Sequence, residues 1–403
     1  MKKGWEYKEL GELCHKFNGL WKGKKAPFVR VGVIRNANFT KAFTLDFSNI
    51  EYLDVEEKQY ASRKLQLGDL IVEKSGGSEK QPVGRAVLFQ EKEGEYSFSN
   101  FTSVLRVKDN HEITPEFLYK YILHVYLRGD TRKMQKATTG IHNIEFDKYL
   151  AIKIPIPPLS KQKEIVEYLD SSFAKIDKLK ENAAKNLEEA KALFQSALKD
   201  ALEPKEGWEE KTLGEVAKIC GGKRLPKGCK LQSEPTNHKY IRVADFLDNG
   251  TVCKDEIQYI TDDIFNQIKR YTISSDDVYI SIAGTIGKSG IVPDELNGAN
   301  LTENACKLVL NKEQDKRFIY FVTISPFFKE QINILTKKSA QPKLALTRLA
   351  TVNVPIPPLS EQQSIVSFLD SLNEKVNTLQ QNYSRICDEC DALKQAILRQ
   401  VFE

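Results

Sequence analysis

A glycine-rich segment, residues 284–289 (GTIGKS), is the first place in this 403-residue sequence where residue type and spacing suggest chemistry. Its Gly-Lys-Ser ending resembles a phosphate-binding loop, in which backbone N–H groups and a lysine hold phosphates. Such a loop needs a glycine five residues before Gly287, where the sequence has Ile282. The spacing therefore indicates a β-turn beside a basic residue.

The cysteines and histidines do not have the spacing of metal ligands. Cys387 and Cys390 form one C-x-x-C with no second pair to complete a zinc site, and the five histidines are scattered. We find no Ser/His/Asp or paired-carboxylate arrangement, and no motif of an amino-group DNA methyltransferase. We therefore expect no catalytic residues and no metal site. The odd number of cysteines, seven, indicates reduced thiols.

Polar and basic side chains are concentrated in loops that differ between the two halves of the chain. Arginine and lysine can read guanine edges, asparagine and glutamine can read adenine, and other cations neutralise phosphates. A solvated loop would have a similar composition. The predicted DNA contacts in the first half are Lys22, Lys24, Lys25, Lys74, Ser75, Ser78, Lys80, Gln81, Arg85, Thr138, Thr139, His142 and Asn143. Those in the second half are Lys223, Arg224, Lys227, Asn237, His238, Thr285, Lys288, Lys337, Lys338, Ser339, Gln341 and Lys343.

The elements that carry these loops are duplicated. Residues 155–203 align without a gap on residues 355–403, with 21 identities in 49 positions, and Gly4-Trp5-Glu6 recurs as Gly207-Trp208-Glu209. The repeat unit is therefore about 200 residues long.

Between these ends the halves share a framework but change register. Asp69-Leu70-Ile71-Val72 matches Asp277-Val278-Tyr279-Ile280, and Val29-Arg30-Val31 is matched with Ile241-Arg242-Val243. Gly84-Arg85 corresponds to Gly287-Lys288 at an offset five residues smaller, which predicts a longer loop around Ser78 to Val83 in the first half.

The repeated tail predicts a helix of about 40 residues, roughly 60 Å long. Paired prolines precede Ser160 and Ser360, which are expected as N-caps, with Gln363 in the capping-box position. The predicted seam of the second helix is Ile365, Leu369, Leu372, Val376, Leu379, Tyr383, Ile386, Cys390, Leu393 and Ile397. The first helix follows through Ile165, Leu169, Ile176, Leu179, Ala183, Ala190, Leu193 and Ala197, with Ser172 and Asn186 as weak positions.

Because each helix follows an equivalent domain, we expect the two helices to pair antiparallel. The alternative is that each folds back on its own domain. The globular parts mix short β-rich runs with fewer helices, including a helix start at Thr114-Pro115-Glu116. The predicted class is α+β, with two pseudo-repeated domains (1–154 and 204–354) joined by two long helices (155–203 and 355–403) that form an antiparallel coiled coil.

The composition sets broader limits. The formal charge of +5 is only mildly basic and does not by itself indicate nucleic acid. No apolar run approaches the roughly 18 residues needed to span a bilayer, and no signal peptide is recognisable. We expect a cytoplasmic protein with no membrane partner.

The paired PIPPLSxQxxIVxxLD segments at 155–170 and 355–370 resemble those of the specificity subunit of a Type I restriction-modification system, and the resemblance covers essentially the whole chain. It implies two target recognition domains that read two different half-sites in double-stranded DNA, with the helices setting the spacing. It also implies docking of methyltransferase subunits, two in number, with restriction or translocase subunits as further partners.

The same resemblance places S-adenosylmethionine, ATP and magnesium in the partner subunits and no cofactor in this chain. Outward faces of the helices are expected to dock the methyltransferase, although the same residues could be solvated helix surface. The predicted partner-binding residues are Gln162, Glu164, Gln362 and Gln363.

Three other interpretations remain open. The chain could be a coiled-coil adapter that never touches DNA, a nucleotide hydrolase built around Gly287-Lys288, or an inactive member of the same family. The sequence does not give the bases recognised, because loop conformation decides which side chain meets which base edge.

Overall fold

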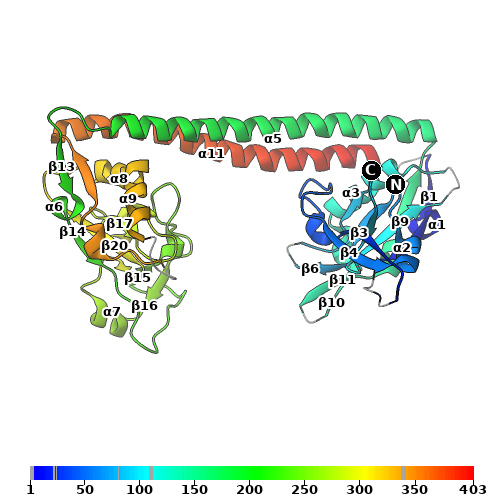
Figure 1. Ribbon diagram of the computed structural model, residues 1–403, viewed down its shortest axis with the longest axis horizontal. Helices are drawn as coiled ribbons and strands as arrows, with labels where there is room; N and C mark the ends of the chain where they lie inside the picture. The colour runs from blue at the N-terminus through cyan, green and yellow to red at the C-terminus, as the bar shows by residue number, and fades with distance from the viewer. Residues whose placement is uncertain are drawn as a thin grey trace. The chain divides into compact units, whose positions relative to one another are not determined.

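The structure is a computed structural model that describes residues 4–20, 23, 25–79, 81–108, 112–138, 140–336 and 342–403, without the side chain of Thr138 (Figure 1). The chain divides into two compact units. Unit 1 is Met1–Asn182 with Arg385–Glu403, and unit 2 is Ala183–Ser384. Each unit therefore contains one globular domain and one part of each long helix.

Unit 1 combines four small sheets with few helices. Its sheets have the strand orders β2-β9-β5-β7, β4-β3-β8, β1-β12 and β10-β11-β6. Its elements are β1 (Glu6–Glu9), α1 (Leu10–Leu13), β2 (Cys14–Asn18), β3 (Phe28–Ile34), η1 (Asn36–Asn38), β4 (Glu51–Glu56), α2 (Glu57–Arg63), β5 (Leu70–Glu73), β6 (Ser75–Gly77), β7 (Ala86–Leu88), β8 (Tyr96–Phe98), β9 (Thr102–Val107), α3 (Pro115–Leu127), η2 (Asp130–Met134), β10 (Gln135–Thr138), β11 (Ile141–Ile144), α4 (Phe146–Leu150), β12 (Lys153–Ile156) and the first part of α5 (Leu159–Ala201).

Unit 2 repeats three of these sheets, with the strand orders β14-β20-β17-β18, β16-β15-β19 and β13-β21. Its elements are β13 (Glu209–Thr212), α6 (Leu213–Val216), β14 (Ala217–Gly221), β15 (His238–Ile241), η3 (Val243–Asp245), β16 (Gln258–Ile260), α7 (Asp262–Ile268), β17 (Val278–Ser281), β18 (Ser289–Ile291), η4 (Asp294–Leu296), β19 (Asn300–Leu301), β20 (Ala305–Leu310), α8 (Lys316–Ile324), α9 (Pro326–Thr336), α10 (Leu346–Leu349), β21 (Asn353–Ile356) and most of α11 (Leu359–Phe402). The α+β class and the pseudo-repeat are confirmed.

Two framework matches can be compared directly. Asp69 and Asp277 are both buried, and each accepts a 2.8 Å bond from the backbone N–H three residues earlier, so that match is confirmed. The match of Arg30 to Arg242 is wrong. Arg35, not Arg30, precedes a 3-10 turn as Arg242 does, and the preceding Ile34 and Ile241 accept equivalent backbone bonds. In the sequence, short apolar runs precede Arg35 and flank Arg30, so either arginine could be aligned with Arg242.

Each domain core is completed by segments of both long helices. In unit 1, Leu169 of α5 and Leu398 of α11 share a core cluster with Phe117 of α3. In unit 2, Leu198 of α5 and Leu369 of α11 pack in one cluster with other buried side chains of the domain. The prediction for the start of α3 is confirmed, since the Thr114 side chain accepts a bond from the Phe117 N–H.

The two helices run antiparallel within unit 1. Lys180 forms an ion pair with Asp391 at 2.5 Å, and Asp177 forms one with Lys394, also at 2.5 Å. Residue numbers rise along α5 as they fall along α11. In unit 2, buried Phe194 of α5 and Leu369 of α11 belong to one core cluster.

The predicted seam is only partly correct. Leu179 and Leu193, both assigned to it, are 58% and 65% exposed, and Asn186 is exposed as well. Leu187 and Phe194 are buried in their place. An α-helix has 3.6 residues per turn, so a strict seven-residue pattern drifts by about 20° per heptad and the buried position moves along the sequence.

The predicted N-caps are wrong by two residues. The helices begin at Leu159 and Leu359, and the carbonyls of Pro158 and Pro358 each accept a 3.0 Å bond from the N–H four residues on. The serines therefore lie inside the first turn. Among the described residues, no helix is both long and apolar enough to cross a membrane.

Candidate nucleic-acid interface

The three-stranded sheet β10-β11-β6 brings together two predicted clusters of unit 1 that are distant in sequence. In this sheet Asn143 lies opposite Ser75, and His142 lies opposite Gly77. The loop that continues from β6 is closed by a 2.8 Å bond from the Ser78 N–H to the Gln81 carbonyl. Residues 74–79 and 81 thus form one surface with residues 140–143.

Several side chains hold this sheet in place. Asn36 donates its amide N–H to the Ser75 carbonyl at 2.6 Å. Tyr126 donates to the Pro82 carbonyl at 3.2 Å, and Arg132 donates to the Glu79 carbonyl at 2.9 Å. Bonds from three separate parts of the domain therefore fix the loop before any ligand arrives.

Lys16 was missed from the sequence and lies close to Lys74. Burial lowers the pKa of Lys16 first, and repulsion from Lys74 lowers it further. Its Nζ lies 4.0 Å from the centroid of the Phe146 ring. Lysine side chains on one surface can neutralise DNA phosphates. A single lysine in a strand gives no signal of this in sequence.

Arg85 requires a correction. Its side chain is buried, with Nε 3.2 Å from Oε2 of Glu73, and its guanidinium lies 5.2 Å from the Phe39 ring centroid. Burial raises the pKa of Glu73 despite this partner. Arg85 therefore neutralises a carboxyl inside the domain and is not presented to DNA.

Lys288 is also committed within its own domain. Its Nζ lies 2.8 Å from the Asp248 carboxylate, whose pKa it lowers. The N–H groups of Gly287 and Lys288 both bond to Ser281, through its carbonyl at 2.9 Å and its hydroxyl at 2.8 Å. A phosphate-binding loop needs such N–H groups free, so the geometry contradicts a nucleotide site here.

The other predicted cations of unit 2 that belong to the described residues are exposed. Arg224 is paired at 2.6 Å with Glu303, while Lys227 and Lys343 are exposed. Lys343 forms a β-bridge with Ala283, so the 282–288 turn and the segment from 342 meet as their counterparts do in unit 1.

The other predicted residues of unit 2 vary in accessibility. His238 stacks on Phe265 at 3.8 Å and contacts Asp262 at 2.9 Å. Lys223, Asn237 and Thr285 are exposed.

Some predicted contacts lie outside the described residues: Lys22, Lys24, Lys80, Thr139, Lys337, Lys338, Ser339 and Gln341. The side chain of Thr138 is also outside them. Lys25 is exposed, and its backbone N–H donates to the Glu56 carboxylate at 2.7 Å.

The prediction that Gln162 and Gln362 face outward is wrong, because both are buried. The side-chain oxygen of Gln162 accepts from the Thr114 N–H at 2.9 Å, and that of Gln362 accepts from the Asp315 N–H at 2.9 Å. Each amide nitrogen donates to the carbonyl of the proline five residues before. These glutamines attach each helix to its domain. Glu164 and Gln363 are exposed.

A duplicated set of exposed apolar side chains occupies the helices instead. Tyr168, Leu179 and Leu193 are 49%, 58% and 65% exposed. Their counterparts 200 residues on, Phe368, Leu379 and Leu393, are 53%, 38% and 47% exposed. Eleven residues are close to three helical turns, so Tyr168 and Leu179 share one helix face in unit 1, and Phe368 and Leu379 share one in unit 2. We call these two sets of two residues the apolar pairs.

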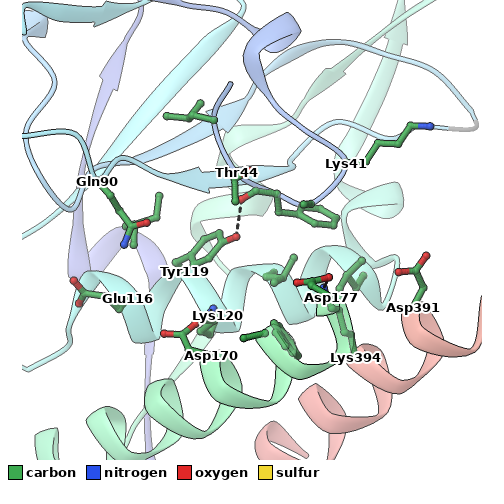
Figure 2. A pocket seen from close by; sticks show the side chains of 18 of the residues that line it. Lys41, Thr44, Gln90, Glu116, Tyr119, Lys120, Asp170, Asp177, Asp391 and Lys394 are labelled. Carbon is green, nitrogen blue, oxygen red and sulfur yellow. Dashed lines mark hydrogen bonds and ion pairs between the residues drawn. The ribbon is translucent and has the colours of Figure 1, made fainter. Parts of the chain in front are cut away.

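A cavity of about 870 Å³ lies in unit 1 between the turn that contains Lys41, α3, and the two helices (Figure 2). Two of its lysines are neutralised at close range: Lys120 lies 2.5 Å from Asp170, and Lys394 lies 2.5 Å from Asp177. The cavity is thus bounded by ion pairs that join α5 to α3 and to α11. Within the described part of the chain, no cluster of three or more His, Cys, Asp or Glu could hold a metal ion.

Comparison with known proteins gives a consistent result. Residues 2–189 and 205–386 match the family model described as the Type I restriction modification DNA specificity domain. The Type I restriction enzyme StySPI specificity subunit of Salmonella potsdam is 24% identical over 395 residues, which cover 93% of this chain and 81% of that protein. The MjaVIII specificity subunit of Methanocaldococcus jannaschii is 24% identical over 298 residues, covering 68% and 67%.

Two solved structures are similar over the whole chain. One is described as "Structural basis underlying complex assembly and conformational transition of the type I R-M system", with a TM-score of 0.78, 20% identity, and coverage of 100% of this chain and 98% of that one. The HsdS subunit from Thermoanaerobacter tengcongensis has a TM-score of 0.52, 20% identity, and coverage of 100% and 97%. At these identities the likeness shows the fold alone.

Proposed function

The chain belongs to the family of Type I restriction-modification specificity subunits, which are non-catalytic, and on this basis we propose that it reads one bipartite, asymmetric DNA target. One observation carries the asymmetry. The link between β5 and β7 spans residues 74–85, whereas its counterpart between β17 and β18 spans residues 282–288. Equivalent corners of the two domains therefore present different side chains to DNA.

Each domain places this corner in a major groove, and the lengths of α5 and α11 set the number of unread base pairs between the half-sites. The methyl donor S-adenosylmethionine, ATP and magnesium are bound by partner subunits. The complex acts in the cytoplasm, where the DNA is. Restriction subunits join through the same assembly.

The apolar pairs are the proposed docking surfaces for two methyltransferase subunits. Exposed tyrosine, phenylalanine and leucine side chains favour protein contacts, and the two pairs recur at equivalent positions of a duplicated helix. Two similar surfaces suit two copies of one partner. This replaces Gln162 and Gln362 as the predicted contacts.

Mapping methylated adenines in DNA from cells that express this chain with its methyltransferase tests the proposal for DNA. We expect two different short half-sites at a fixed spacing. A palindromic motif would contradict the asymmetry. Purified complex should also lose DNA affinity steeply as salt rises. Salt-independent or absent DNA binding would instead support a coiled-coil adapter.

The docking surfaces are tested by Leu179→Glu and Leu379→Glu, which place a charge on each apolar pair and keep helix propensity. We expect each single variant to bind one methyltransferase subunit and the double variant to bind none, measured by mass photometry. Glu188→Ala is the matched control at an exposed helix position outside both pairs and should bind two. Two bound subunits on the double variant would rule out this surface.

A further inference from the structure

The hairpin of β10 and β11 carries its side chains on two faces. Lys136 lies opposite Asn143 in the register, and Ala137 lies opposite His142. Residues on a strand alternate between faces, so Lys136, Ile141 and Asn143 share one face, while His142 and Ile144 share the other. Ile144 is buried in the unit 1 core. The face with Lys136 therefore points away from the domain.

The exposure of three side chains agrees with this assignment, while Ala137, on the face of His142, is exposed as well. Lys136 is exposed and Ile141 is 47% exposed, whereas His142 has its Nδ1 buried without a hydrogen-bond partner. Ser75 of β6 lies opposite Asn143, where the register of β6 against β11 shifts by one residue. Figure 1 shows this sheet on the side of unit 1 remote from α5 and α11.

The outward face has the chemistry of base recognition. A lysine can donate to the O6 and N7 of guanine, an asparagine can pair with the N6 and N7 of adenine, and an apolar side chain can contact the thymine methyl group. The sequences of β6, β10 and β11 (SGG, QKAT and IHNI) contain no acidic residue to repel phosphates. The major groove is wide enough to admit a two-stranded β-ribbon.

Asn36 holds β6 in place and is therefore a positioning residue for the sheet. Asn36 bonds to the Ser75 carbonyl, and a Cβ on Gly76 would lie 3.2 Å from the same Asn36 amide nitrogen. Arg35 and Arg242 are equivalent, so the position of Asn36 is Val243 in unit 2, whose shorter link has no segment of this kind to hold. Asn36 therefore occurs in the unit that has β6, and valine takes its place in the unit with the shorter link.

We propose that the outward face of the β10–β11 ribbon enters the major groove and reads the half-site of domain 1 through Lys136, Ile141 and Asn143, with Asn36 as the positioning residue. The inference rests on the proposed DNA-reading function and narrows it. His142 is then a supporting residue of the inner face.

The test measures binding of the assembled methyltransferase complex to the mapped target and to duplexes with one changed base pair. Lys136→Ala and Asn143→Ala should each reduce discrimination at one base pair of a single half-site, by about 5-fold to 150-fold. Discrimination in the other half-site should not change. Lys133→Ala removes an exposed lysine beside the ribbon and should leave both half-sites unchanged.

Asn36→Val tests positioning, since it installs the side chain that unit 2 has. It should relax several base pairs of the same half-site at once and leave the other half-site intact, which also shows that the complex remains folded. Because Lys136 is exposed, its variant keeps the test valid if Asn36→Val does not fold.

The outcomes separate the two proposals. If Lys136→Ala and Asn143→Ala discriminate between bases as the wild type does, or if both half-sites change, the ribbon does not read the half-site of domain 1. The proposed DNA-reading function would still stand in that case. If the wild-type complex itself shows no bipartite target, the proposed function has failed.

Discussion

The same hairpin corner is built differently in the two units. In unit 1 the Gly84 N–H bonds to the Glu73 carbonyl at 2.9 Å, and in unit 2 the Gly287 N–H bonds to the Ser281 carbonyl at 2.9 Å. The backbone is thus equivalent. The following cation is buried against Glu73 in unit 1 but reaches the exposed Asp248 in unit 2. Framework bonds are kept while side chains are free to change.

A neighbouring turn shows the same contrast. Phe43 has a φ of +62° where unit 2 has Gly250 with a φ of +80°. A Cβ on Gly250 would lie 2.1 Å from the Tyr320 hydroxyl, whereas the equivalent Tyr119 bonds to the Phe43 carbonyl at 2.7 Å. The turn is closely packed in unit 2, and in unit 1 it borders the cavity of Figure 2.

The largest effects should come from the helix ends that complete each core. Phe402→Ala removes a buried ring in contact with Phe117 and Tyr121 and should cost unit 1 about 3 to 5 kcal/mol. Leu202→Ala should cost unit 2 about 2 to 5 kcal/mol. Hydrogen exchange measured during denaturant unfolding should show each loss of stability in its own unit. Equal losses in both units would contradict the division of the chain into two units. Leu193→Ala at an exposed position is the control and should change stability little.

Loss of the cation at the hairpin corner should destabilise unit 1 much more than unit 2. Arg85→Ala leaves the buried Glu73 without its counter-charge and should cost about 3 to 5 kcal/mol. Lys288→Ala breaks a pair with the 93% exposed Asp248 and should cost no more than about 1 kcal/mol. Chemical denaturation of both variants measures the contrast. Comparable losses would show that the two cations have the same role.

The repeated glutamines predict equal effects. Gln162→Ala and Gln362→Ala each leave a buried backbone N–H without its acceptor, at Thr114 and Asp315, and should cost about 1 to 3 kcal/mol. Local hydrogen exchange at the starts of α5 and α11 reports the loss. A large effect in one copy only would contradict their equivalence, and exposed Gln363→Ala is the control.

The smallest effect is a pH dependence confined to unit 1. Burial and the nearby Arg128 and Arg399 hold the pKa of His124 below its usual range, against the attraction of Glu403 and Asp130. The unfolded chain therefore takes up the proton first, so stability is complete above about pH 6.5 and falls as the pH drops below it. Unfolding of His124→Gln between pH 8 and pH 5 should lack this decline. An unchanged decline in the variant would assign it to other groups.

Sequence reasoning was most successful where local pattern decides structure. The gap-free repeat and apolar periodicity predicted the two long helices, and Thr114-Pro115-Glu116 predicted the start of α3. The phase of the seam was lost because small drifts add up along a helix of 43 residues, which moved Leu193 out and Phe194 in.

Contacts between distant segments could not be predicted in the same way. The pairing of β6 with β11 depends on register between segments more than 60 residues apart. The inward turn of Arg85 depends on Glu73 across the hairpin, and the burial of Gln162 depends on the loop before α3. Composition gave residue types suited to DNA, while tertiary structure decides which of them face outward.

The most direct test replaces domain 2 (204–354) by a second copy of domain 1 (1–154), with both long helices retained. Methylated adenines are then mapped in cells that also express the methyltransferase subunit. We expect a palindromic target in which both half-sites match one half of the original, at a spacing set by the unchanged helices. A methylated target that keeps the original asymmetric half-sites would contradict it.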